Sequence, residues 1–174
     1  MRYLVGGRDD LASSADGDAQ LLLELWVMAA PELISPVRRF VASTLRRVLQ
    51  DEDLAYRMEL ASHELLDNAT KYGLRRLVHL RITREAWQGG PALELTLDNE
   101  SDPSNIGRLE RMVNAMGHAD DPMGHYLGLM HEQMPGALAL GLARVRAEGE
   151  LDLALSVEGG RVAVTVRAPL GDKS

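Results

Sequence analysis

The chain has 174 residues, 45% of them hydrophobic and 26% charged, which is typical of an ordinary globular domain with a sizeable core. It contains no cysteine, which excludes disulfides, thiolate zinc sites and cysteine nucleophiles. The net charge of −7 argues against nucleic-acid binding, because that function needs a concentrated positive surface. We see no signal peptide and no apolar run near the roughly 20 residues of a membrane span, so we expect a cytoplasmic protein that does not bind membranes.

Apolar periodicity predicts the elements in chain order. The first apolar run is nearly continuous and is consistent with a strand, although periodicity alone also allows the start of a helix. Spacings of three and four residues then indicate helices, and strict alternation indicates strands with one buried face. We expect a strand at 20–29, helices at 36–50 and 53–72, strands at 78–83 and 93–98, a helix at 106–116, a long loop at 117–135 with a short helix around 124–132, a helix at 138–147, and a hairpin of strands at 151–157 and 162–166.

Capping residues mark the ends of the first two helices. Ser35 followed by Pro36 predicts an N-cap and a proline in the first helical turn. The polar residues at 50–53 include aspartates that can cap the second helix, and Gly73 is the expected glycine just beyond its end.

The order of elements predicts an α/β fold of the α+β kind. We expect a two-layer sandwich in which a mixed or largely antiparallel sheet is covered on one face by helices. No linker or repeat divides the chain, so residues 19–168 are expected to form a single domain between flexible tails at 1–18 and 169–174. No GxGxxG motif follows an early strand, so the signature of a doubly wound dinucleotide fold is missing.

The second helix carries an unusual group of polar residues. Glu64, Asn68 and Lys71 lie at spacings of four and three and therefore fall within roughly 60° of one another around a helix. A carboxylate can act as a general base, an amide oxygen suits Mg²⁺ that is already bound by phosphate, and an ammonium can neutralise phosphate charge. Since phosphoryl transfer depends mostly on positioning and electrostatics, these groups predict a metal–phosphate site, although charges beside an apolar stripe are also common on surface helices.

The stretch ELLDNATKYG at 64–73 resembles the N box of the histidine kinase-like ATPases, the GHKL or Bergerat-fold superfamily. In that family the Asn binds Mg²⁺, the Glu is the general base and the Lys approaches phosphate. The resemblance therefore implies ATP and Mg²⁺ as cofactors and assigns these roles to Asn68, Glu64 and Lys71.

The two glycine boxes of the family are eroded in this chain. Asp98 stands where the family has the Asp that takes the adenine amino group, but no glycines follow it. In the phosphate-binding run at 136–142, Ala137 and Ala139 replace two glycines, and alanine can forbid a close backbone approach to a phosphate. The residues that match the family at this run are Gly136, Leu140, Gly141 and Leu142.

Within the superfamily, the chain is most similar to the small anti-sigma-factor-type serine kinases of bacteria. The resemblance implies partner switching, in which such a kinase binds a STAS-type antagonist, phosphorylates it and sometimes sequesters a sigma factor. Relatives of this kind often form homodimers, and their ATP lid corresponds to residues 117–135. Two hypotheses remain at this point: an ATP- and Mg²⁺-binding signalling regulator with serine kinase activity, and a catalytically silent interaction module with the same fold.

Overall fold

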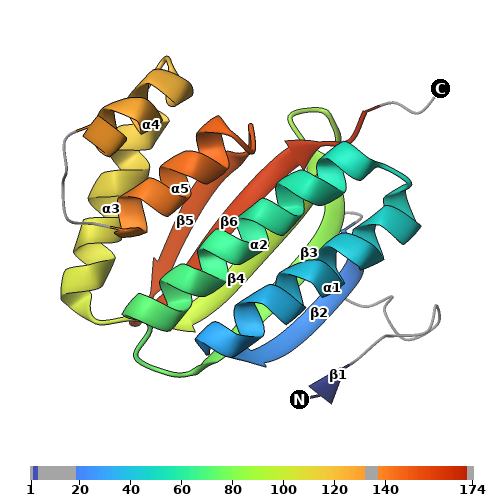
Figure 1. Ribbon diagram of the computed structural model, residues 1–174, viewed down its shortest axis with the longest axis horizontal. Coiled ribbons are helices and arrows are strands. Elements are labelled where there is room, and N and C mark those ends of the chain that lie inside the picture. Colours follow the sequence, from blue (N-terminus) through green and yellow to red (C-terminus); the bar gives the residue numbers. More distant parts are fainter. Residues whose placement is uncertain (1, 4–18, 132–136, 172–174) are drawn as a thin grey trace.

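The computed structural model describes residues 2–3, 19–131 and 137–171 as two layers (Figure 1). One layer is a six-stranded sheet with the strand order β1-β2-β3-β4-β6-β5, and every neighbouring pair is antiparallel. Helices cover one face of this sheet, as the order of elements predicts. The elements are β1 (Arg2–Tyr3), β2 (Gln20–Met28), α1 (Pro31–Leu49), α2 (Glu52–Tyr72), β3 (Leu77–Trp87), β4 (Gly90–Glu100), α3 (Pro103–Gly117), α4 (Pro122–His131), α5 (Ala137–Ala147), β5 (Asp152–Glu158) and β6 (Arg161–Pro169).

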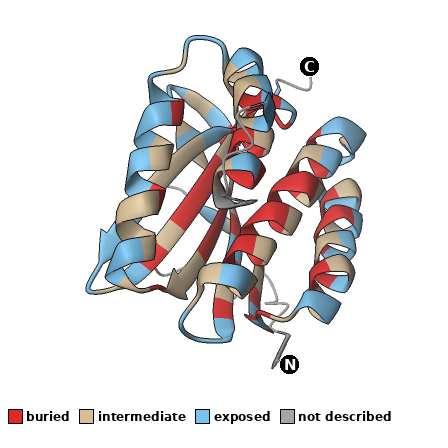
Figure 2. Cartoon of the chain, turned by 60° about the vertical axis from the view of Figure 1, so that its left-hand side comes forward, coloured by how far each residue is buried: buried red, intermediate tan, exposed pale blue. Residues whose placement is uncertain are grey.

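The core lies between the sheet and the helices (Figure 2). Alternate residues of each strand point towards the helices, so cross-strand rows of apolar side chains form the floor of the core. One such row runs through the paired residues Leu25, Leu80, Leu97 and Val164. Two tight turns fix the register of the hairpins, because Gln88–Gly89 and Gly159–Gly160 all have positive φ.

Helix α1 begins five residues before the predicted start. Its N-cap residue is Ala30 and Pro31 opens the helix, so Ser35 is not the N-cap and Pro36 lies inside the helix. The longer helix buries Ile34 in line with the apolar stripe that follows it. This burial compensates for the one backbone hydrogen bond that a proline in the helix cannot make.

Helix α2 has the predicted Asp51 cap, whose carboxylate accepts a hydrogen bond from the backbone N–H of Leu54 at 2.9 Å. The other end differs from expectation, because Gly73 has extended backbone angles rather than the left-handed ones of a usual C′ glycine. Glycine is needed there for another reason: a Cβ atom would lie 2.5 Å from the carbonyl oxygen of Ala69. A β-bridge between Gly73 and Ser101 then joins the end of α2 to the end of β4, and this junction forms one end of the candidate site.

The segment that the sequence predicts as a long loop contains the whole of α4, which starts two residues before the expected short helix. Two residues of the predicted N-terminal tail, Arg2 and Tyr3, pair with β2 at the edge of the sheet. The flexible behaviour expected for the rest of that tail concerns residues 4–18, which lie outside the described part of the chain.

Candidate functional site

Two of the three polar residues predicted on α2, Glu64 and Asn68, lie on its buried side, next to the apolar stripe that packs on the sheet. Glu64 and Asn68 are both only 9% exposed. Between them, Leu65 and Leu66 are almost fully buried, so the helix cannot rotate about its axis without exposing core residues. The fold therefore holds a carboxylate and an amide, one helical turn apart, inside the protein.

Glu64 contacts helix α5 through both carboxylate oxygens. Its Oε1 accepts a hydrogen bond from the guanidinium of Arg144 at 3.3 Å. On the other side the backbone of Gly141 approaches so closely that a Cβ atom there would lie 2.5 Å from Oε2. The residue that the sequence predicts as a general base is thus part of an ion pair between two helices.

Asn68 faces a small enclosed cavity between the two layers. The cavity has a volume of about 30 Å³, which is enough for roughly two water molecules and far too small for a purine. The Nδ2 atom of Asn68 is buried and has no hydrogen-bond partner among the described residues. The cavity is lined by Leu65, Asn68, Ala69 and Tyr72 of α2, Leu97 and Asn99 of β4, Ser101, Asn105 and Leu109 of α3, Leu142 of α5, and Val162 and Val164 of β6.

The structure does not bring Asp98 to this cavity. Asp98 pairs across the sheet with His79, whose ring stacks on Trp26 with 4.1 Å between the ring centroids. Since Leu97 points into the core, Asp98 points to the opposite, helix-free face, where its carboxylate lies 3.6 Å from His79 Nδ1. Its neighbour Asn99 lines the cavity instead.

Lys71 lies on the exposed side of α2. Its ammonium pairs with the Asp67 carboxylate, one turn earlier, at 2.5 Å, and that hydrogen bond raises the pKa of Lys71. In this arrangement the ammonium makes its ion pair with Asp67 rather than with Glu64.

The residues of the eroded glycine run form the first half of α5. Gly141 and Leu142 are buried, the first against Glu64 and the second in the wall of the cavity, whereas Leu140 is 36% exposed. Gly136 lies outside the described residues. The first turn of α5 carries backbone N–H groups without intrahelical partners, and such groups favour phosphate.

Helix α4 contributes Tyr126, which sequence analysis did not single out. Its side chain is buried, and this burial, together with the nearby carboxylate of Glu148, raises the pKa of the Tyr126 hydroxyl. Glu148 in turn accepts a hydrogen bond from Nε of Arg144 at 2.7 Å. Tyr126, Glu148, Arg144 and Glu64 therefore form one polar cluster that joins α2, α4 and α5.

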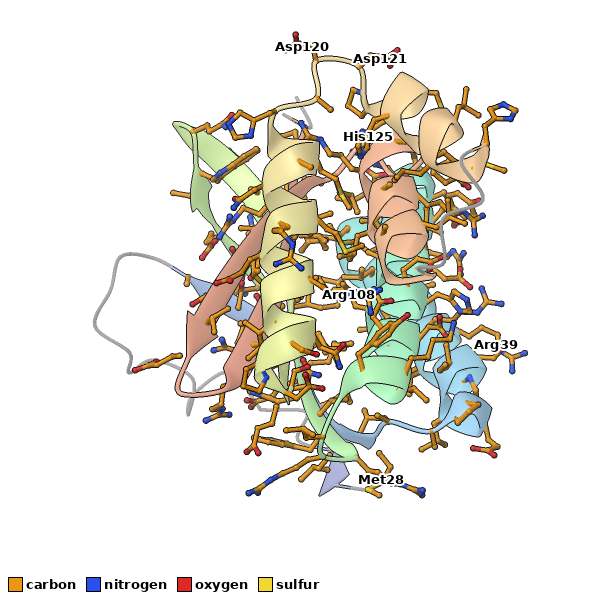
Figure 3. The ribbon with its side chains drawn as sticks, turned by 90° about the vertical axis from the view of Figure 1, so that its left-hand side faces the viewer. Met28, Arg39, Arg108, Asp120, Asp121 and His125 are labelled. Atoms are coloured by element: carbon orange, nitrogen blue, oxygen red, sulfur yellow. The ribbon has the colours of Figure 1, made fainter. Side chains whose placement is uncertain are left out.

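Figure 3 shows how these helices meet. Helix α3 stands beside α5, and α4 lies at the end of the molecule where Asp120 and Asp121 are labelled. Sequence signals could have identified Asn99, because the alternation of leucines in its strand places it on the same face as Leu97. No comparable signal exists for Arg144 or Tyr126, whose roles depend on helices packing across long sequence separations.

Comparison with known proteins agrees with this architecture. A family model described as the histidine kinase-like ATPase domain matches residues 27–135, and the chain belongs to this family. A chain in the crystal structure of the SiaB-SiaC complex from Pseudomonas aeruginosa has a similar fold, with a TM-score of 0.59. The two chains are 17% identical, and the match covers 86% of this chain and 90% of the other. A search of curated proteins finds no match.

Helices capable of crossing a bilayer are not found in the part of the chain that the structure describes.

Proposed function

We propose that this protein is an ATP- and Mg²⁺-binding regulator of bacterial signalling that acts on a protein partner, in the manner of the anti-sigma-factor-type serine kinases. The observation that carries the proposal is the amide of Asn68, which is buried beside a cavity with an unpaired Nδ2 atom. A buried amide without a partner is costly unless a ligand completes its hydrogen bonds. Membership of the ATPase family makes a nucleotide the natural ligand class.

Four side chains have roles in this proposal. Asn68 would hold Mg²⁺ through its amide oxygen, with phosphate oxygens and water completing the shell. Bound Mg²⁺ would supply charge neutralisation at the phosphates. Glu64 would accept the proton of the attacking hydroxyl, and Lys71 would neutralise phosphate charge after leaving Asp67. Asn99 would contact the adenine, the role that the family resemblance gives to Asp98.

The partner in this proposal is a small protein of the STAS type or a sigma-like factor. This choice of partner rests on the resemblance of the chain to small regulators that work by partner switching. The similar fold in the SiaB-SiaC complex supports a protein partner, since that chain occurs in an assembly of two proteins.

Isothermal titration with Mg·ATP tests the nucleotide part, with ADP as the comparison ligand. The wild type should bind, and Asn68→Ala should lose about tenfold or more in affinity. Because Nδ2 of Asn68 makes no hydrogen bond with the described residues, its loss should leave thermal stability almost unchanged. Asn114→Ala on the exposed side of α3 is the matched control and should bind like the wild type. Absence of binding at millimolar nucleotide would refute the proposal.

Transfer of labelled phosphate to a STAS-type partner tests the kinase part. Glu64→Ala should still bind Mg·ATP but transfer phosphate at least about a hundredfold more slowly, the usual contribution of a general base. Equal transfer rates in the two proteins would remove Glu64 from the mechanism.

A second candidate function is a protein-interaction module that has kept the fold and lost turnover. Two observations favour it: Ala137 and Ala139 replace glycines of the phosphate-binding run, and Glu64 is already ion-paired. This function predicts that Asn68→Ala binds the protein partner as the wild type does and that Mg·ATP produces no thermal shift in either protein. An ATP-induced shift that disappears in Asn68→Ala would contradict it.

A further inference from the structure

Arg144 contacts the proposed general base from a different helix. Its guanidinium donates to Glu64 at 3.3 Å and to Glu148 at 2.7 Å, so it is held between two carboxylates. The side chain of Glu64 is only 11% exposed, whereas that of Arg144 is 40% exposed. The ion pair therefore joins a buried carboxylate to a guanidinium that can reach solvent.

This contact limits what Glu64 can do chemically. The lone pair of Glu64 Oε1 that accepts the hydrogen bond from the guanidinium is not available to a substrate hydroxyl. The second oxygen lies so close to the backbone of Gly141 that a Cβ atom there would be 2.5 Å away, which restricts access to it from the side of α5. Glu64 can serve as a general base only if α5 or the Arg144 side chain moves.

Arg144 has space into which it can move. On its outer side it borders a groove of about 240 Å³ between α1, α2 and α5, which is also lined by Arg38, Tyr56, Glu59, Leu60 and His63. A long side chain on the surface can change rotamer quickly, because neighbouring protein atoms do not enclose it. Glu64 has no such freedom, since α2 is fixed on the core through Leu65 and Leu66.

We infer that Arg144 is a positioning residue that restrains Glu64, so that turnover requires the Arg144–Glu64 contact to break. The inference rests on the proposed function, because it concerns the general base of that reaction. It names a regulatory step in the same site: nucleotide can bind while Glu64 is restrained, but proton transfer waits for release of Arg144. Arg144 does not touch the reacting atoms and acts only through Glu64.

The test compares the Arg144→Gln variant with the wild type, using the full chain. Calorimetry gives Kd for Mg·ATP, and the rate of ADP release at saturating Mg·ATP gives kcat for ATP turnover. We expect kcat to rise by about tenfold or more while Kd changes by less than about threefold. Arg47→Gln removes an exposed arginine of α1 and is the charge-matched control, with no expected change in either constant.

A double variant separates restraint of Glu64 from a general loosening of the fold. If Arg144 acts through Glu64, the gain from Arg144→Gln disappears when Glu64→Gln is also present. A kcat in Arg144→Gln that is equal to or below that of the wild type overturns the inference, and so does a gain that persists in the double variant. Arg144→Lys keeps the charge without the planar fork and should give an intermediate kcat, which provides a second reading if the glutamine variant is unstable.

Hydrogen exchange in the nucleotide-free protein distinguishes failure of this inference from failure of the proposed function. Amides of α5 from Leu142 to Ala147 should exchange faster in both Arg144→Gln and Glu64→Gln, with no further increase in the double variant. If no variant binds Mg·ATP, the proposed function fails and this coupling still decides whether Arg144 and Glu64 fasten α5 to α2. Exchange that is unchanged in the single variants would overturn the contact itself.

Discussion

At Gly141 helix α5 comes so close to α2 that an added side chain would displace the Glu64 carboxylate. A methyl group on this residue would lie 2.5 Å from Oε2 of Glu64, well inside van der Waals contact. The site therefore depends on a residue without a side chain as much as on the charged residues around it. Gly141, one of the two glycines present in the run at 136–142, allows α5 to lie close to Glu64.

The Gly141→Ala variant should displace the Glu64 carboxylate and weaken its pairing with Arg144. We expect a loss of about 1–3 kcal/mol in the free energy of unfolding, the usual cost of overpacking a buried contact. Urea denaturation measures the change. Gly117→Ala is the control, because a Cβ atom at Gly117 would meet nothing within 4 Å. Equal stability of Gly141→Ala and the wild type would show that Glu64 moves aside at no cost.

The positions of Asp98 and Asn99 show what could and could not be predicted for single residues from the sequence. The alternation of leucines in β4 was visible in the sequence and is sufficient to place Asp98 on the face opposite the helices. Matching the family's motif by position placed it at the nucleotide instead. A match by position does not include the direction of the side chain, which depends on the alternation of residues along the strand.

Substitution of these two neighbours gives opposite predictions for nucleotide binding. Asn99→Ala removes a side chain from the wall of the cavity and should weaken Mg·ATP binding by about tenfold, the value of one hydrogen bond. Asp98→Ala acts on the other face of the sheet and should leave the Kd unchanged. Calorimetry on the pair measures both effects, and weaker binding by Asp98→Ala alone would reverse the assignment.

Among the elements, α3 supplies one wall of the cavity, and its first turn depends on Asp102. The carboxylate of Asp102 accepts a hydrogen bond from the backbone N–H of Asn105 at 2.9 Å and another from the Asn105 side chain at 2.7 Å. The backbone hydrogen bond holds the pKa of Asp102 below its ordinary value of 3.8. Asn105 itself lines the cavity, so this cap fixes part of the site.

Acid should therefore loosen the first turn of α3 before the rest of the fold. Because the pKa of Asp102 is lower in the folded state, its contribution is fully present above pH 3.8 and is lost as pH falls through the lowered pKa. Hydrogen exchange at the amides of Asn105 and Leu109 during an acid titration measures this loss. Asp102→Asn keeps a capping side chain that does not titrate, so its α3 amides should show no such step. The same acid step in the asparagine variant would assign it to another group.

The sequence predicted the kind and order of most elements correctly, because apolar periodicity reflects burial directly. Element ends were less certain where packing outweighs local chemistry. Ser35 and Pro36 have the composition of a helix start, yet burial of Ile34 extends α1 towards the N-terminus. Gly73 ends α2 as predicted, but a close approach to Ala69 requires glycine there, rather than a left-handed conformation.

At the scale of the whole molecule, the cavity is too small for its proposed ligand. A cavity of about 30 Å³ cannot admit a purine, so nucleotide binding requires α3 to move away from α2. Helices α2, α4 and α5 can stay joined meanwhile by the cluster around Tyr126 and Arg144. By contrast, α1 packs on α2 outside the cavity.

Saturating Mg·ATP should consequently change the hydrogen exchange of α3 while leaving the buried amides of α1 as they are. The physical reason is that α3 forms a wall that must separate from α2 around the ligand, whereas no residue of α1 lines the cavity. Mass-spectrometric exchange with and without Mg·ATP measures the effect, and ADP shows whether the terminal phosphate is needed. Tight binding without any change in α3 would mean that the nucleotide occupies another place.

Contacts between distant segments were the part that sequence reasoning could not supply. Glu64 and Arg144 are 80 residues apart, and nothing in the spacing of either helix indicates that they meet. Their contact follows from the sheet, which brings α2 and α5 onto one face. The pairing of distant strands likewise makes all described neighbours antiparallel, whereas the sequence also allowed a mixed sheet.

The place of β6 in the sheet has a consequence for how the protein is made. It is the last of the strands in the described residues, yet it lies inside the sheet between β4 and β5. During synthesis, β4 leaves the ribosome before β6. One edge of β4 therefore stays unpaired until β6 follows. A nascent chain that contains residues 27–135 has the whole family match and still exposes an edge that can pair with another chain. The open edge of β4 is therefore covered only after β6 has left the ribosome, later than the residues of the family match.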